Sequence, residues 1–108
     1  MHSLLIDHLS TAVVKLDNGL LIEYLNPAAE ILLAVSRRRV YGQSIENVFF
    51  EDEHGLAALN DAVVTGHPFT KREAKFEMPN GKKLFLDYTV TPVMGASNGT
   101  ESLLIELY

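Results

Sequence analysis

The stretch that decides the fold is Asp17-Asn18-Gly19-Leu20-Leu21-Ile22-Glu23-Tyr24-Leu25-Asn26-Pro27-Ala28-Ala29-Glu30. Its Asp-Asn-Gly sequence lies between two apolar runs, and these residue types tolerate the positive φ angles that tight β-turns require. Asn26 offers a side-chain oxygen to the free N–H groups of a helix that begins at Pro27, since proline's fixed φ suits the first helical position. The stretch therefore predicts a β-hairpin whose second strand leads directly into a helix.

The segments on either side of this stretch predict a small α+β domain. Apolar residues recur every three or four positions in the expected helices and every second position in the expected strands. The elements expected in this way are a short amphipathic helix at 3–9, strands at 11–16 and 20–25, helices at 26–35, 44–49 and 52–65, and strands at 69–78, 84–91 and 102–108. Asn80-Gly81 gives the strongest short hairpin signal. Two hairpins with helices between them can share one antiparallel sheet, with the helices covering one face.

Composition restricts the classes of function that this chain can serve. Its 108 residues, of which 47% are hydrophobic, are enough for one domain with a real core. Cysteine is absent, which excludes disulfides and thiolate chemistry. The start of the chain lacks a signal-peptide pattern, no apolar run is long enough to span a membrane, and the net charge of −5 disfavours nucleic acid. We therefore expect a cytoplasmic domain with neither a membrane nor a nucleic-acid partner.

The order of these elements resembles a PAS domain over essentially the whole chain. The hallmark of that family is matched by Asn26-Pro27-Ala28-Ala29-Glu30, followed by Leu32-Leu33. Further matching features are Gly42, the Asn80-Gly81 turn and Thr91-Pro92-Val93. The resemblance implies a PAS fold, which is a five-stranded antiparallel sheet with helices on one face, used as a sensor and dimerisation module in signalling proteins.

A narrower resemblance is to the N-terminal sensor domains of nitrogen-regulation histidine kinases. It is carried by Leu32-Leu33-Ala34 and by Ser36-Arg37-Arg38 leading to Gly42. It implies that residues 1–108 are the PAS domain of a cytoplasmic two-component sensor kinase and form a homodimer. The implied partners are the kinase domains of the parent chain and the PII signal protein acting on that kinase. The alternative is a small-molecule or cofactor-binding PAS receptor module of another signalling protein.

No catalytic constellation is found in the sequence. The histidines are His2, His8, His54 and His67. None of them lies in the His-Glu-x-x-Asn-Pro context of a kinase phosphoacceptor site, and there is no Gly-rich phosphate loop or Gly-x-Ser-x-Gly motif. Asp87 beside Tyr88 is a formal acid/base pair, but an outward carboxylate on a strand is expected to be solvated. We therefore expect that the chain is not an enzyme.

The PAS resemblance raises two cofactor alternatives. Flavin photochemistry in that family requires a cysteine, which this chain lacks. Haem-binding relatives resemble this chain only in having a histidine near the long helix, where His54 lies. An exposed histidine in an acidic first turn is the preferred interpretation, because haem also needs a deep pocket. We therefore expect neither a cofactor nor a metal.

A ligand pocket between the helices and the sheet is a third alternative. Its expected lining is Leu32, Phe49, Leu59, Phe76, Tyr88 and Val90. A metabolite site needs a few converging polar groups, and these inward faces supply little beyond the Tyr88 hydroxyl. A plain packed core is therefore the preferred interpretation.

Two further segments are candidate contact surfaces. The first is the expected N-terminal helix, with the apolar residues Leu4, Leu5, Ile6 and Leu9. Because such a helix is too short to be stable alone, we expect it to pack on its own sheet, on the same helix of a second chain, or on both. The second segment is 37–39, three consecutive arginines, for which a solvated turn or a contact with the kinase domains is preferred to an anion or nucleic-acid site.

Overall fold

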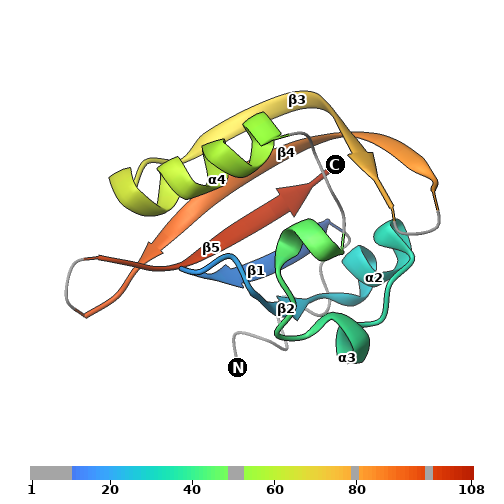
Figure 1. Ribbon diagram of the computed structural model, residues 1–108, viewed down its shortest axis with the longest axis horizontal. Coiled ribbons are helices and arrows are strands. Elements are labelled where there is room, and N and C mark those ends of the chain that lie inside the picture. Colours follow the sequence, from blue (N-terminus) through green and yellow to red (C-terminus); the bar gives the residue numbers. More distant parts are fainter. Residues whose placement is uncertain (1–10, 49–52, 79–80, 97–98) are drawn as a thin grey trace.

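The computed structural model of the protein describes residues 11–48, 53–78, 81–96 and 99–108 (Figure 1). Its elements are β1 (Ala12–Asp17), β2 (Ile22–Leu25), α2 (Pro27–Leu33), α3 (Arg37–Val40), the 3-10 helix η1 (Ile45–Asn47), α4 (Glu53–Thr65), β3 (Phe69–Glu77), β4 (Lys83–Met94) and β5 (Thr100–Leu107). The strands form one antiparallel sheet in the order β2-β1-β5-β4-β3. This confirms the predicted five-stranded antiparallel sheet. The helix expected at 3–9 lies outside the described residues.

One face of the sheet forms the core. In β4 the alternation predicted from the sequence is confirmed, since Leu86, Tyr88 and Val90 are buried while Phe85, just before Leu86, is 67% exposed. The residues of β5 that pair with these buried positions of β4, such as Ile105 opposite Val90, point to the same buried face. A two-residue period in the sequence has thus become a two-sided sheet.

The helices cover that buried face in two groups. Figure 1 shows α4 over the β4 and β5 side, and α2 with α3 near β1 and β2. Leu59 and Ala62 of α4 and Ala29 and Leu33 of α2 belong to the same apolar cluster as the inward residues of the strands. Burying one stripe of each helix against one face of the sheet produces a two-layer α+β domain.

The turn between β1 and β2 differs from the expectation in one respect. The Asp17 carboxylate accepts hydrogen bonds from the N–H groups of Gly19 and Leu21, both at 2.9 Å, so the expected hairpin is present. The residue with positive φ is Leu20, at 66°, and not one of the Asp-Asn-Gly residues. Leu20 is buried in the core, and this burial offsets a left-handed conformation that costs about 1–2 kcal/mol.

The hairpin between β3 and β4 closes as predicted and contains a bulge. Gly81 has φ 84° and donates its N–H to the Met78 carbonyl, which suits its place in the turn. The β3–β4 register shifts between Lys71 and Ala74, where Glu73 has φ 53° and donates its N–H to the Asp87 carboxylate at 2.8 Å. The expectation of a purely solvated Asp87 carboxylate is therefore wrong, because it holds the bulge.

The segment after the first long helix is more irregular than predicted. The helix expected at 26–35 ends at Leu33, because Ala34 adopts the left-handed conformation with φ 55° and donates its N–H to the Glu30 and Ile31 carbonyls. A separate short helix, α3, follows. The helix expected at 44–49 is the single 3-10 turn η1 in the described part.

Candidate functional site

The strand-to-helix corner is built on Asn26, whose side chain is fully buried. Its Oδ1 accepts hydrogen bonds from the N–H groups of Val13 and Ala29, both at 2.9 Å. Its Nδ2 donates to the Thr11 carbonyl at 2.8 Å. Both polar atoms of the side chain are therefore used to join β1 to the first turn of α2. The interpretation of Asn26 as a helix cap is confirmed, and the residue has an additional role in holding β1.

The next corner, between α2 and α3, is built in the same way. The Glu30 carboxylate accepts a hydrogen bond at 2.8 Å from the N–H of Arg37, the first residue of α3. The Arg37 guanidinium in turn lies 5.1 Å from the centre of the Tyr24 ring, in a cation–π contact with β2. Asn26 and Glu30, the polar ends of the Asn-Pro-Ala-Ala-Glu motif, thus each supply an acceptor to the start of a helix.

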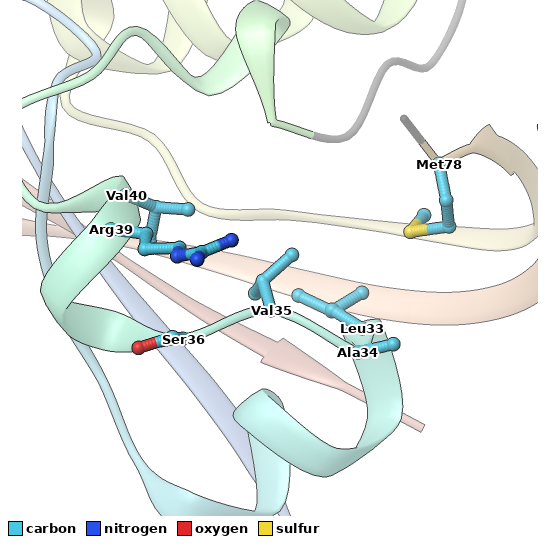
Figure 2. Close-up of a pocket in the computed structure, with 7 residues that line it drawn as sticks. All are labelled: Leu33, Ala34, Val35, Ser36, Arg39, Val40 and Met78. Atoms are coloured by element: carbon cyan, nitrogen blue, oxygen red, sulfur yellow. The ribbon is translucent and has the colours of Figure 1, made fainter. Parts of the chain in front are cut away.

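A pocket of about 370 Å³ lies beyond this corner, between α2, α3 and the end of β3. We name it the arginine pocket. The described residues that line it are Leu33, Ala34, Val35, Ser36, Arg39, Val40 and Met78 (Figure 2). Its volume lies within the range of small-molecule sites, roughly 300–1,000 Å³. Most of its wall is apolar, and the Arg39 guanidinium is the charged group among these side chains.

The three consecutive arginines have three different surroundings. Arg37 stacks on Tyr24, and Arg38 is exposed without lining the pocket. Figure 2 shows the Arg39 guanidinium pointing into the arginine pocket. Within the described residues, no hydrogen bond or ion pair of that guanidinium is found. The sequence does not predict this distinction, since three identical consecutive residues carry no pattern that separates their side chains.

The lining predicted from the sequence is partly gathered in one place, but around a filled core. Leu59, Phe76, Tyr88 and Val90 are all buried in one apolar cluster. The Tyr88 ring lies 5.6 Å from the Phe76 ring and 5.9 Å from that of Phe69, measured between ring centres. Leu32 is partly buried and packs against the same cluster, and Phe49 lies outside the described residues. The described linings of the arginine pocket and of the groove below contain none of the four core residues.

A second depression, of about 520 Å³, lies where β1 begins and β5 ends. We name it the terminal groove. Its described lining is Thr11, Ala12, Ala28, Ile31, Leu32, Leu107 and Tyr108. Ile31 is 81% exposed at its rim, and no charged side chain is among these residues. The terminal groove therefore offers apolar contact without a polar group other than hydroxyls and backbone to orient a ligand.

The described residues hold no recognisable catalytic arrangement. His67 is exposed, and the Asp87 carboxylate is occupied by the bulge. No group of three or more His, Cys, Asp or Glu side chains in the described ranges could hold a metal ion. Among the same residues, no helix has the length and apolar character needed to cross a membrane. His2, His8 and the N-terminal residues Leu4, Leu5, Ile6 and Leu9 lie outside the described residues, and the His54 side chain is likewise not described.

Comparison with known sequences matches nearly the whole chain. A family profile described as the PAS fold matches residues 1–105. The sensory histidine kinase/phosphatase NtrB of Vibrio alginolyticus is 34% identical over 91 residues, which are 84% of this chain and 26% of that relative. The chain therefore spans about a quarter of the length of this curated relative.

Solved structures give the same result for the fold. The PAS domain of nitrogen regulation protein NR(II) from Vibrio parahaemolyticus superposes with a TM-score of 0.80 at 32% identity, covering 100% of this chain and 96% of that one. An RNA-binding light-oxygen-voltage receptor superposes with a TM-score of 0.84 at 18% identity, covering 99% of this chain and 31% of that one. The second likeness concerns the fold alone, because the identity is so low.

Proposed function

Because the chain belongs to the PAS family, we propose that residues 1–108 form the sensory and homodimerisation module of a cytoplasmic two-component sensor histidine kinase of the nitrogen-regulation, NtrB-like type. The observation that carries this proposal is the identity above 30% with NtrB and with the NR(II) PAS domain over most of the chain. Distant PAS domains share the shape equally well. The identity, and not the shape, therefore supports the assignment to nitrogen regulation.

The module acts in this proposal without chemistry of its own. The NtrB relative is much longer than this chain, so the phosphoacceptor histidine and the ATP-binding domain are assigned to other parts of the parent protein. A module that regulates such domains needs a stable body and contact surfaces, and not a nucleophile and a base. The absence of a metal cluster or acid/base pair from the described residues is compatible with this role.

Homodimerisation is assigned to the N-terminal segment with Leu4, Leu5, Ile6 and Leu9. Four apolar residues within six positions need a partner to be removed from water. A second copy of the same segment would supply one by two-fold symmetry, the commonest arrangement of homo-oligomers. Histidine kinases work as dimers, so this contact would set the relation between two protomers.

The signal would leave the domain at the end of β5. Tyr108 exchanges two backbone hydrogen bonds with Asp87 of β4, at 2.8 and 3.3 Å, so this end of the strand is held in the sheet. A change in how two protomers pack would therefore reach the kinase domains of the parent chain through a rigid element. The PII signal protein is the proposed partner that biases the parent kinase between two arrangements with different partner affinities.

The dimer assignment is tested by light scattering over a concentration series up to high micromolar protein. We expect a dimer for the wild-type chain and a monomer for the double variant Leu5→Glu/Leu9→Glu, because each added charge would have to be desolvated at the contact. Val64→Glu is the matched control, since Val64 is an apolar residue of α4 that is 83% exposed. A wild-type chain that stays monomeric throughout, or a double variant that still dimerises, contradicts the assignment.

The assignment to nitrogen regulation is tested on the parent kinase. Autophosphorylation and phosphatase activity are measured with and without PII, for the full protein and for a variant without residues 1–108. We expect the shorter protein to keep histidine autophosphorylation and to lose its response to PII. An unchanged response to PII would remove this domain from that regulation.

A further inference from the structure

The arginine pocket has walls that are already in place. Leu33, Val40 and Met78 are among its lining residues, and their side chains are only 1%, 6% and 4% exposed. All three belong to the apolar core cluster, so their positions are fixed by packing behind the pocket. A pocket with such walls needs little reorganisation to accept an apolar group. Met78 is also an adaptable side chain that fits irregular apolar shapes.

The charge in the arginine pocket has no neutralising carboxylate among the described lining residues. The formal net charge of the chain is −5, yet no carboxylate is among the described lining residues. Glu30, which lies on the neighbouring helix, directs its Oε2 to the Arg37 N–H. The Ser36 hydroxyl points away from the other lining side chains in Figure 2. Within the part of the chain that the structure describes, Arg39 therefore faces apolar walls without a carboxylate beside it.

Hydrogen bonds hold the backbone of Arg39, whereas its guanidinium has no partner among the described residues. The Arg39 N–H donates to the Ser36 carbonyl at 3.0 Å, and the Arg39 carbonyl accepts from Gln43 Nε2 at 2.7 Å. A fixed backbone limits the volume that the guanidinium can sample. The Arg39 side chain thus extends from a fixed backbone position into a pocket whose described lining contains no anion.

From this geometry we infer that the arginine pocket binds a small amphipathic monocarboxylate, with the carboxylate on the Arg39 guanidinium and the apolar chain between Leu33, Val35 and Met78. The planar guanidinium matches a carboxylate with two parallel hydrogen bonds. A volume of about 370 Å³ is at the small end for ligand sites, which favours a short or medium acyl chain. A dicarboxylate fits poorly, because its second charge would meet an apolar wall.

This inference goes beyond the proposed function and does not depend on dimerisation. The pocket residues lie on α2, α3 and β3, whereas the proposed dimer contact is assigned to the N-terminal segment. Binding is measured on the wild-type chain and on the Leu5→Glu/Leu9→Glu variant. We expect the double variant to lose the dimer and to keep octanoate binding. A double variant that still dimerises contradicts the dimer assignment alone, and a wild-type chain that dimerises without binding octanoate contradicts the pocket alone.

The probes are octanoate, octanol and octanedioate, titrated into the protein and followed by methyl chemical shifts in NMR. Octanol keeps the tail without the charge, and octanedioate adds a second charge. We expect octanoate to shift the methyl signals of Val35, Val40 and Met78 saturably. Octanol should bind about tenfold more weakly, since it lacks the charge-assisted pair and 1.4 kcal/mol corresponds to tenfold. Octanedioate should also bind about tenfold more weakly, because its second carboxylate would meet an apolar wall.

Two variants on the same short helix separate the pocket cation from general positive charge. Arg39→Gln should weaken octanoate binding about tenfold and leave octanol binding unchanged. Arg38→Gln removes the same charge from an exposed residue that does not line the pocket, and should leave both affinities unchanged. Circular dichroism on each variant verifies that the fold is retained.

Several results would overturn the inference. These are the absence of saturable octanoate binding at millimolar concentration, equal affinities for octanoate and octanol, and equal effects of Arg38→Gln and Arg39→Gln. A further one is a set of shifts confined to Ile31 and Leu107, which would place the ligand in the terminal groove instead.

Discussion

Two polar side chains, one at the start of α2 and one beyond its end, have opposite surroundings. At its start, Asn26 is fully buried and both of its side-chain polar atoms are hydrogen bonded. Beyond its end, Arg39 is exposed and directs into an apolar pocket a charge that has no partner among the described residues. The motif that identifies the fold has therefore used its hydrogen-bonding capacity on the chain itself. The residue with capacity left for a ligand lies outside that motif, in the arginine run 37–39.

The largest loss of stability is expected at the start of α2, with Asn26→Ala. This change removes a helix cap and leaves the buried Val13 N–H and the partly buried Thr11 carbonyl without their partner. Each orphaned group costs about 1–3 kcal/mol, so we expect a loss of about 3 kcal/mol in the free energy of unfolding. Urea denaturation measures it. Asn60→Ala on the exposed side of α4 is the matched control, expected within about 0.5 kcal/mol of wild type. A loss below about 1 kcal/mol for Asn26→Ala would show that the corner is held by packing.

An intermediate effect is expected at the second corner, with Glu30→Ala. The carboxylate accepts one hydrogen bond from the Arg37 N–H in a partly exposed position. We expect a loss of about 1 kcal/mol, and a smaller loss for Glu30→Gln, which keeps an acceptor oxygen. Denaturation of both variants and of the exposed control Glu46→Ala gives the comparison. Equal losses for Glu30→Gln and Glu30→Ala would show that the acceptor oxygen does not carry the contribution.

A stabilising change is expected between the two ends, at Ala34. Its φ of 55° costs about 1–2 kcal/mol for an L-residue, and glycine relieves this cost while losing more entropy on folding. We expect Ala34→Gly to raise the free energy of unfolding by about 0.5 kcal/mol. The same exchange within α4, Ala57→Gly, should lower it by about 1 kcal/mol. Thermal unfolding of both variants tests the opposite signs, and a destabilising Ala34→Gly would contradict the strain argument.

The smallest effect on stability is expected beyond the end of α2, with Arg39→Gln. The guanidinium has no hydrogen-bond or ion-pair partner within the described residues, so its loss should change the free energy of unfolding by less than about 0.5 kcal/mol. Urea denaturation alongside Asn26→Ala measures the contrast directly. A loss above about 1 kcal/mol would make Arg39 a structural residue and remove the contrast between the two ends.

Sequence reasoning succeeded where a residue's role depends on its immediate neighbours. The strict alternation from Leu84 to Val90 predicted which side chains of β4 are buried, because a strand has a period of two. Asn26 before Pro27 predicted the helix cap, since the acceptor and the donors lie within three residues of each other. Such patterns can be recognised in the sequence alone, because the residues involved are close together in the chain.

The remaining features depend on contacts far apart in the chain. Leu20, and not a residue of Asp-Asn-Gly, takes the positive φ because its side chain is drawn into the core. Asp87 holds a bulge fourteen residues away, at Glu73, which no local pattern announces. The predicted lining residues Tyr88 and Phe76 face each other, but in a packed core.

By itself, the sequence determined the two-layer α+β arrangement, the PAS family and the strand-to-helix corner at Asn26. The arrangement and the corner follow from periodicity and capping, which act over a few residues. The family follows from the resemblance carried by Asn26-Pro27-Ala28-Ala29-Glu30. Only the tertiary structure decided which of three identical arginines faces a pocket, because that depends on where α2 stops and where Met78 at the end of β3 lies relative to α3. Pairing and burial join residues distant in the sequence, so the availability of a side chain for a ligand is a property of the folded chain.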